Sequence, residues 1–265
     1  MAEAHAGPAI ELEGVGKEFT ARGGRVVALE AIDLTIAPKE FAAILGPSGC
    51  GKSTLLNMVA GFDVPTRGHV RASGATVDGP DPRRAVVFQE AALFPWYTVL
   101  DNTKFGPKTC GVPATIYEPR VTAVLEQVGL TGFERHYPAE LSGGMKQRVA
   151  IARVLVMEPE MLLMDEPFGS LDAQTRSVMQ ELLLSVWERS HQTVLFITHD
   201  IEEALLLADS VSVMTARPGR IKKRLTVELP RPRSLEVTMS PRFNELKREV
   251  LALIREESLR VAREG

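Results

Sequence analysis

The amino-acid sequence predicts an α/β fold in which buried strands end at ligand-binding loops, and three observations support this prediction. A short apolar run, residues 41–45, leads into a glycine-rich loop and then into a helical pattern. Two later apolar runs, residues 161–164 and 194–198, each end in polar residues. Strand ends of this kind form the ligand-binding edge of open α/β sheets.

The N-terminal region predicts antiparallel strands that lie over this core. Residues 9–40 alternate apolar and polar positions, as the segments 26–29 and 32–36 show. Residues 68–71 and 75–80 continue the pattern.

The glycine-rich loop, residues 46–54, fits the phosphate-binding pattern G-x-x-x-x-G-K-[ST]. Backbone N–H groups of such a loop surround phosphate oxygens. The next helix, residues 52–60 with Gly61 as its cap, adds the positive end of its dipole. Lys52 supplies a full charge for the β- and γ-phosphates, and the Ser53 hydroxyl suits Mg²⁺. An ordinary glycine turn before a helix is the alternative, and the lysine and serine in register disfavour it.

The loop as a whole is the predicted ATP-binding segment. Its residues are Gly46, Pro47, Ser48, Gly49, Cys50, Gly51, Lys52, Ser53 and Thr54. We expect Cys50 to fill space inside the loop rather than to act as a nucleophile.

The run 161–164 ends in two acids, Asp165 and Glu166. A buried strand would deliver both to the ligand-binding edge, where Asp165 is suited to hold Mg²⁺ through water and Glu166 to polarise the attacking water. An exposed acid pair at a strand end is the alternative. The run 194–198 ends in the same way, at His199.

A second glycine motif occupies residues 141–148, where Ser142-Gly-Gly144 precedes a helical pattern over residues 149–155. Glycines in front of a helix N-terminus predict a second anion site. A plain serine-capped helix is the alternative.

These motifs, in this order, resemble the ATP-binding cassette (ABC) family. The resemblance identifies residues 141–148 as the ABC signature, Gln89 as the glutamine loop, residues 161–167 as Walker B, and His199 as the switch histidine. It implies a P-loop NTPase fold with a RecA-like core, an N-terminal antiparallel β subdomain and an inserted α-helical subdomain. The catalytic residues that it implies for ATP hydrolysis are Lys52, Gln89, Glu166 and His199.

The resemblance also assigns the remaining site residues. Phe19 is expected to stack on adenine, with an ordinary core position as the alternative. The implied ligands of Mg²⁺ are Ser53, Gln89 and Asp165. The family forms a head-to-tail dimer, and its implied D-loop residues are Ser170, Leu171 and Asp172. The signature residues that meet the ATP of the other subunit are Ser142, Gly143, Gly144 and Gln147. Lys39 stands in a turn where the family commonly has glycine, so we expect a different turn geometry there.

The chain is predicted to hold an ABC ATPase domain over residues 8–235 and a C-terminal helical extension over residues 236–265. The helical subdomain covers about 90–155, with helix breaks predicted at prolines 95, 107, 113, 119 and 138. Ser240 and Pro241 are suited to open the terminal helix. Its apolar stripe is Phe243, Leu246, Val250, Leu253 and Ile254. We expect this stripe to pack on its own domain, and a regulatory or dimer contact is the alternative.

Composition excludes several other classes. The 265 residues carry a net charge of −3, so the chain has no overall electrostatic footprint for nucleic acid. No apolar run approaches the ~18 residues of a membrane span, and the N-terminus lacks a secretory pattern. The two cysteines do not form a disulfide framework.

Residues 87–96, 101–102, 217–221 and 229–233 resemble one importer subgroup, which serves nitrate, sulfonate, taurine and related solutes in bacteria. This implies an ATP-hydrolysing subunit at the cytoplasmic face of the bacterial inner membrane. The implied partners are a second copy, transmembrane permease subunits and, indirectly, a periplasmic or lipoprotein solute-binding protein, without nucleic acid. The apolar segment 91–99 favours permease docking over local core.

Two other functions are alternatives to the importer ATPase. The first is a soluble ABC ATPase acting on nucleic acid or ribosomes, which often carries two cassettes or long coiled coils. The second is a P-loop kinase or GTPase, and the signature and His199 argue against it.

Overall fold

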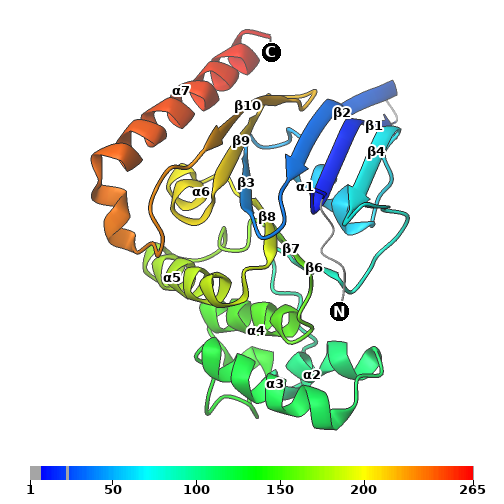
Figure 1. Ribbon diagram of the computed structural model, residues 1–265, viewed down its shortest axis with the longest axis vertical. Coiled ribbons are helices and arrows are strands. Elements are labelled where there is room, and N and C mark those ends of the chain that lie inside the picture. Colours follow the sequence, from blue (N-terminus) through cyan, green and yellow to red (C-terminus); the bar gives the residue numbers. More distant parts are fainter. Residues whose placement is uncertain (1–6, 22–23, 265) are drawn as a thin grey trace. The chain divides into compact units, whose positions relative to one another are not determined.

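The computed structural model describes residues 7–21 and 24–264 and divides the chain into two compact units. The first unit combines Met1–Asp81 with His191–Gly265, and the second is Pro82–Ser190 (Figure 1). The structure confirms the predicted mixed α/β fold, with an antiparallel sheet and parallel strand pairs.

The antiparallel sheet belongs to the first unit and has the strand order β2-β1-β4-β5. Its strands are β1 (Ile10–Ala21), β2 (Gly24–Ile36), β4 (Arg67–Ala72) and β5 (Ala75–Thr76). Ile10 lies opposite both Ile36 of β2 and Ala72 of β4, and the buried side chains of β2 alternate with exposed ones. The alternation in the sequence therefore predicted this sheet correctly, although β5 is shorter than its pattern.

The first unit also contains four strands in the order β10-β9-β3-β8. They are β3 (Phe41–Leu45), β8 (Thr193–Ile197), β9 (Ser210–Met214) and β10 (Ile221–Thr226). β3 runs parallel to β8 and β9, and all residues of these three strands are buried, as expected for parallel strands covered on both faces. The loops that leave their carboxyl ends therefore emerge at one edge.

Two helices of the first unit begin at this edge. α1 (Lys52–Ala60) follows β3, and α6 (Ile201–Leu207) follows β8. Gly61 ends α1 with φ 83°, as predicted, and a Cβ there would lie 2.1 Å from the carbonyl oxygen of Gly79. Only glycine fits this helix end.

The turn before β3 departs from its prediction. Lys39, for which we expected a different geometry because lysine replaces glycine, has φ 65°. This is the left-handed region that favours glycine.

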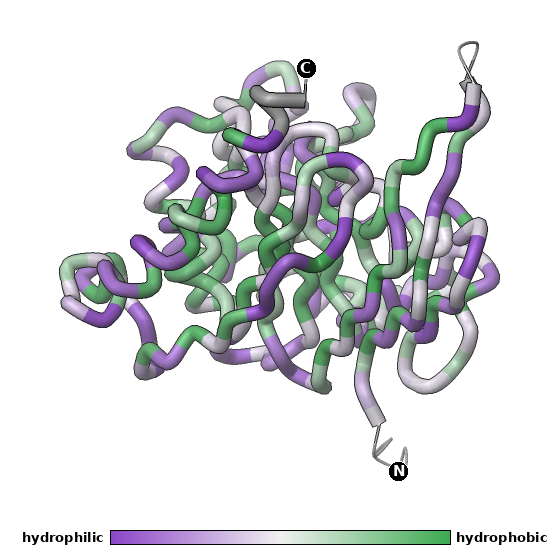
Figure 2. The backbone as a smooth tube through the Cα atoms, turned by 90° about the horizontal axis from the view of Figure 1, so that it is seen from above, coloured by the Kyte–Doolittle hydropathy of each residue, from purple (hydrophilic) through white to green (hydrophobic). Residues whose placement is uncertain are grey.

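The terminal helix α7 (Pro241–Glu264) follows the short 3₁₀ helix η2 (Leu235–Met239). The Ser240 hydroxyl accepts a hydrogen bond from the N–H of Phe243 at 3.2 Å, which caps α7 as predicted. Figure 2 shows hydrophilic and hydrophobic residues alternating along this helix. Phe243, Leu246 and Val250 are buried, and α7 contacts α6 and β9. The stripe thus packs on its own unit.

The second unit pairs β6 (Arg84–Val87) with β7 (Met161–Asp165) in parallel and is otherwise helical. Its helices are α2 (Val99–Thr109), α3 (Ala114–Gln127), the 3₁₀ helix η1 (Pro138–Glu140), α4 (Gly143–Leu155) and α5 (Ala173–Ser190). α4 contacts α2, α3 and α5.

Two of the predicted helix breaks are wrong. Pro107 lies inside α2 and Pro119 inside α3. Each proline removes one backbone N–H from its helix, and both helices nevertheless continue past the proline and contact α4. Within residues 7–21 and 24–264, none of the helices is both long and apolar enough to cross a membrane.

Candidate nucleotide-binding site

Strand register brings the predicted site residues of each unit to one sheet edge. In the first unit, Ile44 of β3 lies opposite Ile197 of β8, so Gly46 and His199 follow at equivalent positions. In the second unit, Val87 of β6 lies opposite Met164 of β7. Gln89 therefore emerges beside Asp165 and Glu166, as expected at the carboxyl ends of parallel strands.

The phosphate loop, residues 46–54, has the backbone of an anion cradle. Gly49 has φ 76° and Gly51 has φ 100°, a region that residues with side chains rarely adopt. A Cβ on Gly46 would lie 2.8 Å from the Cys50 sulfur. Cys50 is buried and fills the inside of the loop, as predicted. Successive glycines therefore let the chain curl around a bound anion.

Lys52 is the first residue of α1, and its side chain packs against this loop. The side chain is buried, and its Nζ donates to the carbonyl oxygens of Gly46 at 2.9 Å and Pro47 at 3.2 Å. An ammonium group has three N–H donors and keeps its charge when it bonds to carbonyls. The lysine Nζ thus lies against the first two residues of the loop.

The first turn of α1 faces the same loop. Its N-cap is Gly51, which brings no side chain to satisfy the first N–H groups of the helix. Ser53 is exposed in that turn. A hard hydroxyl oxygen and uncapped N–H groups suit a magnesium-bound phosphate.

Phe19 lies on β1 with 43% of its surface exposed. Lys17 Nζ lies 5.1 Å from the centroid of the Phe19 ring, and it bonds to Asp63 at 2.5 Å and to the carbonyl of Val64 at 2.8 Å. These anchors hold the ammonium over one face of the ring. Phe19 is thus not a core residue, and its stacking on adenine stays a prediction.

His199 is exposed in a short connection between β8 and α6. Its neighbours are fixed on both sides. The N–H of Asp200 donates to the Thr198 hydroxyl at 3.0 Å, and Asp200 Oδ1 accepts from the N–H groups of Glu202 and Glu203. The helix cap therefore sets where the histidine backbone stands.

The second unit brings Gln89 and Glu166 together around Gly169. A Cβ on Gly169 would lie 3.3 Å from Gln89 Nε2 and 3.7 Å from Glu166 Oε2. Glu166 has φ 45°, a strained conformation of the kind that collects at functional sites. Asp165 is half-buried at the end of β7. Gly169 was not predicted as a site residue, although it lies between the Walker B and D-loop residues.

The predicted D-loop residues lead into α5. Ser170 and Asp172 are exposed and Leu171 is buried. Asp172 Oδ1 accepts from the N–H of Thr175 at 3.0 Å, and hydrogen bonds from Thr175 lower the pKa of the Asp172 carboxyl. Asp172 therefore stays ionised at neutral pH.

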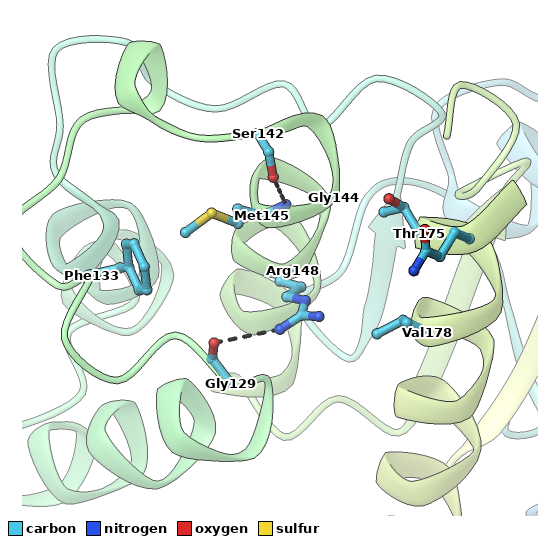
Figure 3. Close-up of a pocket in the computed structure, with 9 residues that line it drawn as sticks. Gly129, Phe133, Ser142, Gly144, Met145, Arg148, Thr175 and Val178 are labelled. Atoms are coloured by element: carbon cyan, nitrogen blue, oxygen red, sulfur yellow. Dashed lines mark hydrogen bonds between the residues drawn. The ribbon is translucent and has the colours of Figure 1, made fainter. Parts of the chain in front are cut away.

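The signature residues open α4. Ser142 and Gly143 are exposed, and the Ser142 hydroxyl accepts from the N–H of Met145 at 3.3 Å. Gly144 is buried, and a Cβ there would lie 2.4 Å from Thr175 Cγ2. Figure 3 shows these residues beside a pocket of about 340 Å³ between α4 and α5. It is lined by Gly129, Phe133, Ser142, Gly144, Met145, Arg148, Gln174, Thr175 and Val178.

Gln147 does not join this exposed group. Its side chain is buried, and Nε2 donates to the carbonyl of Phe88 at 3.3 Å. The predicted contact of Gln147 with the ATP of another subunit is therefore not supported by its orientation. In this structure Gln147 braces the residue before Gln89.

The apolar segment 91–99 is partly packed and partly exposed. The Phe94 ring lies 4.5 Å from the ring of Phe105, and Arg153 lies over Phe94 while donating to the carbonyl of Ala92. Trp96 has 67% of its surface exposed. Local packing thus holds the segment in shape, while one large aromatic side chain remains on the surface.

The ABC transporter family profile matches residues 29–169. The nitrate import ATP-binding protein of Synechocystis is 44% identical and covers 93% of this chain and 95% of its own. The taurine import ATP-binding protein of Jannaschia is 47% identical and covers 88% of both. A dimeric ATP-binding cassette solved in a post-hydrolysis state with ADP and phosphate has TM-score 0.72 at 30% identity, over 83% of this chain and 100% of its own.

Proposed function

The chain belongs to the ABC transporter family of ATP-hydrolysing cassettes, and on that premise we propose that it energises the import of nitrate, taurine, a sulfonate or a related small solute. The names of the Synechocystis and Jannaschia relatives support this class of solute. None of the comparisons favours a nucleic-acid or ribosome factor, and we propose no nucleic-acid partner.

One observation carries the assignment of the ATP site. Lys52 is buried beneath a loop whose glycines adopt positive φ, at the sheet edge where His199 also emerges. Phosphate oxygens would accept from the loop N–H groups and from Lys52, while Phe19 stacks on the base. Residues 46–54 then hold the nucleotide in this subunit.

The roles proposed for hydrolysis follow from the residue types. Glu166 polarises the attacking water as its general base. Gln89, whose amide lies beside Gly169 with the Glu166 carboxylate, orients that water, and His199 contacts the γ-phosphate. The oxygen donors Ser53, Gln89 and Asp165 would hold Mg²⁺, which keeps several waters and neutralises phosphate charge when bound.

We propose that two copies close head to tail on ATP and separate after hydrolysis. The similar cassette solved as a dimer with ADP and phosphate supports this cycle. Ser142 and Gly143 are exposed at the N-terminus of α4, where the positive end of the helix dipole favours a γ-phosphate from the partner. Ser170 and Asp172, also exposed, would lie at the same dimer contact.

The exposed aromatic surface of the second unit is the proposed docking site for a permease. Trp96 is mostly exposed, and Phe88, directly before Gln89, is 43% exposed. A permease loop bound there would contact the residue next to the catalytic glutamine. We place the subunit at the cytoplasmic face of the inner membrane, with a periplasmic or lipoprotein solute-binding protein as an indirect partner.

Solute uptake tests this proposal. Cells lacking the subunit are complemented with the wild-type chain, with Lys52→Ala, or with Lys223→Ala, an exposed lysine that pairs with Glu249. Uptake of labelled nitrate, taurine and an alkanesulfonate should return with the wild-type chain and the Lys223 variant only. Normal uptake by the Lys52 variant would overturn the proposal.

A second test isolates the chemistry. Glu166→Gln keeps the size of the side chain and removes its basicity, so it should accumulate an ATP-bound dimer with little turnover. Size-exclusion chromatography with ATP detects that dimer. Wild-type hydrolysis by this variant would show that Glu166 is not the base.

A further inference from the structure

The turn between β9 and β10, residues 215–220, leaves the parallel strands at the same edge as the phosphate loop. Leu45 of β3 lies opposite Val213 of β9, so the segments that follow these two strands turn at the same level of the sheet. The turn closes on itself through Thr215, whose hydroxyl donates to the carbonyl of Pro218 and accepts from the N–H of Arg220, both at 2.9 Å. It is therefore a defined structure beside the nucleotide loop.

Arg217 connects this turn to the phosphate loop. Its Nη2 donates to the carbonyl oxygen of Gly49 at 3.2 Å. The other end of the same peptide, the N–H of Cys50, donates to the carbonyl of Pro47 at 3.3 Å. Because the peptide unit is planar, holding its oxygen also fixes the direction of its N–H.

Gly219 makes the second contact. A Cβ at this position would lie 2.0 Å from the carbonyl oxygen of Cys50 and 3.0 Å from Leu29 Cδ2. The N–H of Gly219 donates to Ala28 at 2.9 Å, and its carbonyl accepts from Glu30 at 3.0 Å. The turn is thus wedged between β2 and the phosphate loop.

The far side of the turn is tied to α7. Glu257 is 4% exposed, and its Oε2 accepts from the N–H of Ala216 at 3.1 Å in a buried position. Glu257 also pairs with Lys222 of β10 at 2.7 Å and with Arg260 at 3.2 Å. The residue next to Arg217 is therefore anchored on the terminal helix.

We propose that Arg217 is a positioning residue for the phosphate loop. We also propose that Glu257 of α7 fixes the position of the turn that carries Arg217. The terminal helix then contributes to ATP affinity without touching the nucleotide. The turn reaches the phosphate loop through the bond from Arg217 to the carbonyl of Gly49 and through the close approach of Gly219 to the carbonyl of Cys50, so a small shift of Ala216 moves both contacts. The inference rests on the proposed role of residues 46–54 as the ATP loop.

Nucleotide binding and turnover by the full chain test the inference. Each variant is titrated with a fluorescent ATP analogue, its kcat and KM for ATP are measured, and its thermal unfolding is recorded. Arg217→Ala should raise the dissociation constant and KM by about three- to ten-fold, the range for one exposed hydrogen bond of ordinary strength, with kcat changed less than about two-fold. Arg217→Lys, which keeps a donor and the charge, should recover most of the affinity.

Two matched controls come from the same elements. Arg220→Ala removes another exposed arginine of the turn, one that pairs with Glu30, and should leave ATP affinity unchanged. Glu257→Ala should raise the dissociation constant, whereas Glu256→Ala, which removes the exposed partner of Lys222, should not.

The outcomes separate the two proposals. Wild-type affinity in Arg217→Ala, or equal losses in Arg217→Ala and Arg220→Ala, would overturn the positioning role. A Glu257→Ala protein that melts earlier but binds ATP normally would overturn the link to α7. If Lys52→Ala binds the analogue as tightly as wild type, the phosphate-loop assignment itself fails, whatever Arg217 does.

Discussion

Replacing Arg233 with methionine should destabilise the first unit by several kcal/mol. The Arg233 side chain is 1% exposed, and its guanidinium donates to five backbone carbonyls. Three of these, on Leu205, Leu206 and Ala208, lie at the C-terminal end of α6, where carbonyls lack helix partners. Arg233 is thus the C-terminal cap of the helix that follows His199.

The magnitude follows from the geometry of these bonds. The bond to Ala208 is 2.7 Å, and the other four are 3.2 to 3.3 Å, so one bond is strong and four are weaker. Methionine keeps much of the apolar stem but leaves buried carbonyls without a donor. Leaving one buried acceptor without its donor costs about 1–3 kcal/mol, and simple addition over five bonds would overestimate the total because they share one group.

Chemical denaturation checks this value. The urea midpoint and slope of wild type, Arg233→Met and Arg233→Lys are compared, with Arg248→Met as a control on the exposed side of α7. We expect Arg233→Lys to fall between the other two, because a single ammonium cannot reach two separate groups of carbonyls. A loss below about 1 kcal/mol for Arg233→Met would refute the reasoning.

Three further predictions concern other sites. Gly144→Ala should lower stability by about 1–2 kcal/mol, since the clash with Thr175 Cγ2 outweighs the gain in helix propensity, and adding Thr175→Ser should restore it in the same urea titration. Lys39→Gly should raise stability by about 0.5–1 kcal/mol by relieving the positive φ, whereas Lys39→Ala, which keeps the strain, should give no gain. Burial alone would raise the pKa of Glu257, but hydrogen bonds from Lys222 and the Ala216 N–H outweigh it and lower that pKa. The stability from this carboxylate is therefore present at neutral pH and lost as pH falls through its folded pKa, so melting curves of Glu257→Gln should depend less on pH below ~5 than those of wild type.

The nucleotide edge was predictable because its signals are local. Buried parallel strands such as β3 and β8 read as uninterrupted apolar runs, and the loop after each is marked by glycine or by polar residues. The apolar pattern predicted α4 only from residue 149, although the helix begins at Gly143. The prediction started too late because glycines are weak helix formers. Ser142 caps the helix and offsets that weakness.

Other features depend on contacts between distant parts of the chain. Arg217 bonds to Gly49, and Gln147 turns to Phe88, across separations that no local pattern reports. The signature motif predicted that Gln147 meets the ATP of another subunit, whereas its side chain packs against the residue before Gln89. The pair of half-buried Lys222 and buried Glu257 likewise resembles two ordinary surface charges in the sequence.

The β9–β10 turn also constrains how the chain can vary in length. Most surface loops accept inserted or deleted residues because their ends alone are fixed. Here Gly219 is paired with Ala28 and Glu30 and pressed against Cys50, while Ala216 is bonded to Glu257. One extra residue would shift the turn out of register with β2, the phosphate loop and α7 at once. We therefore expect this short hairpin to keep a fixed length in functional variants, unlike the exposed turns elsewhere in the first unit.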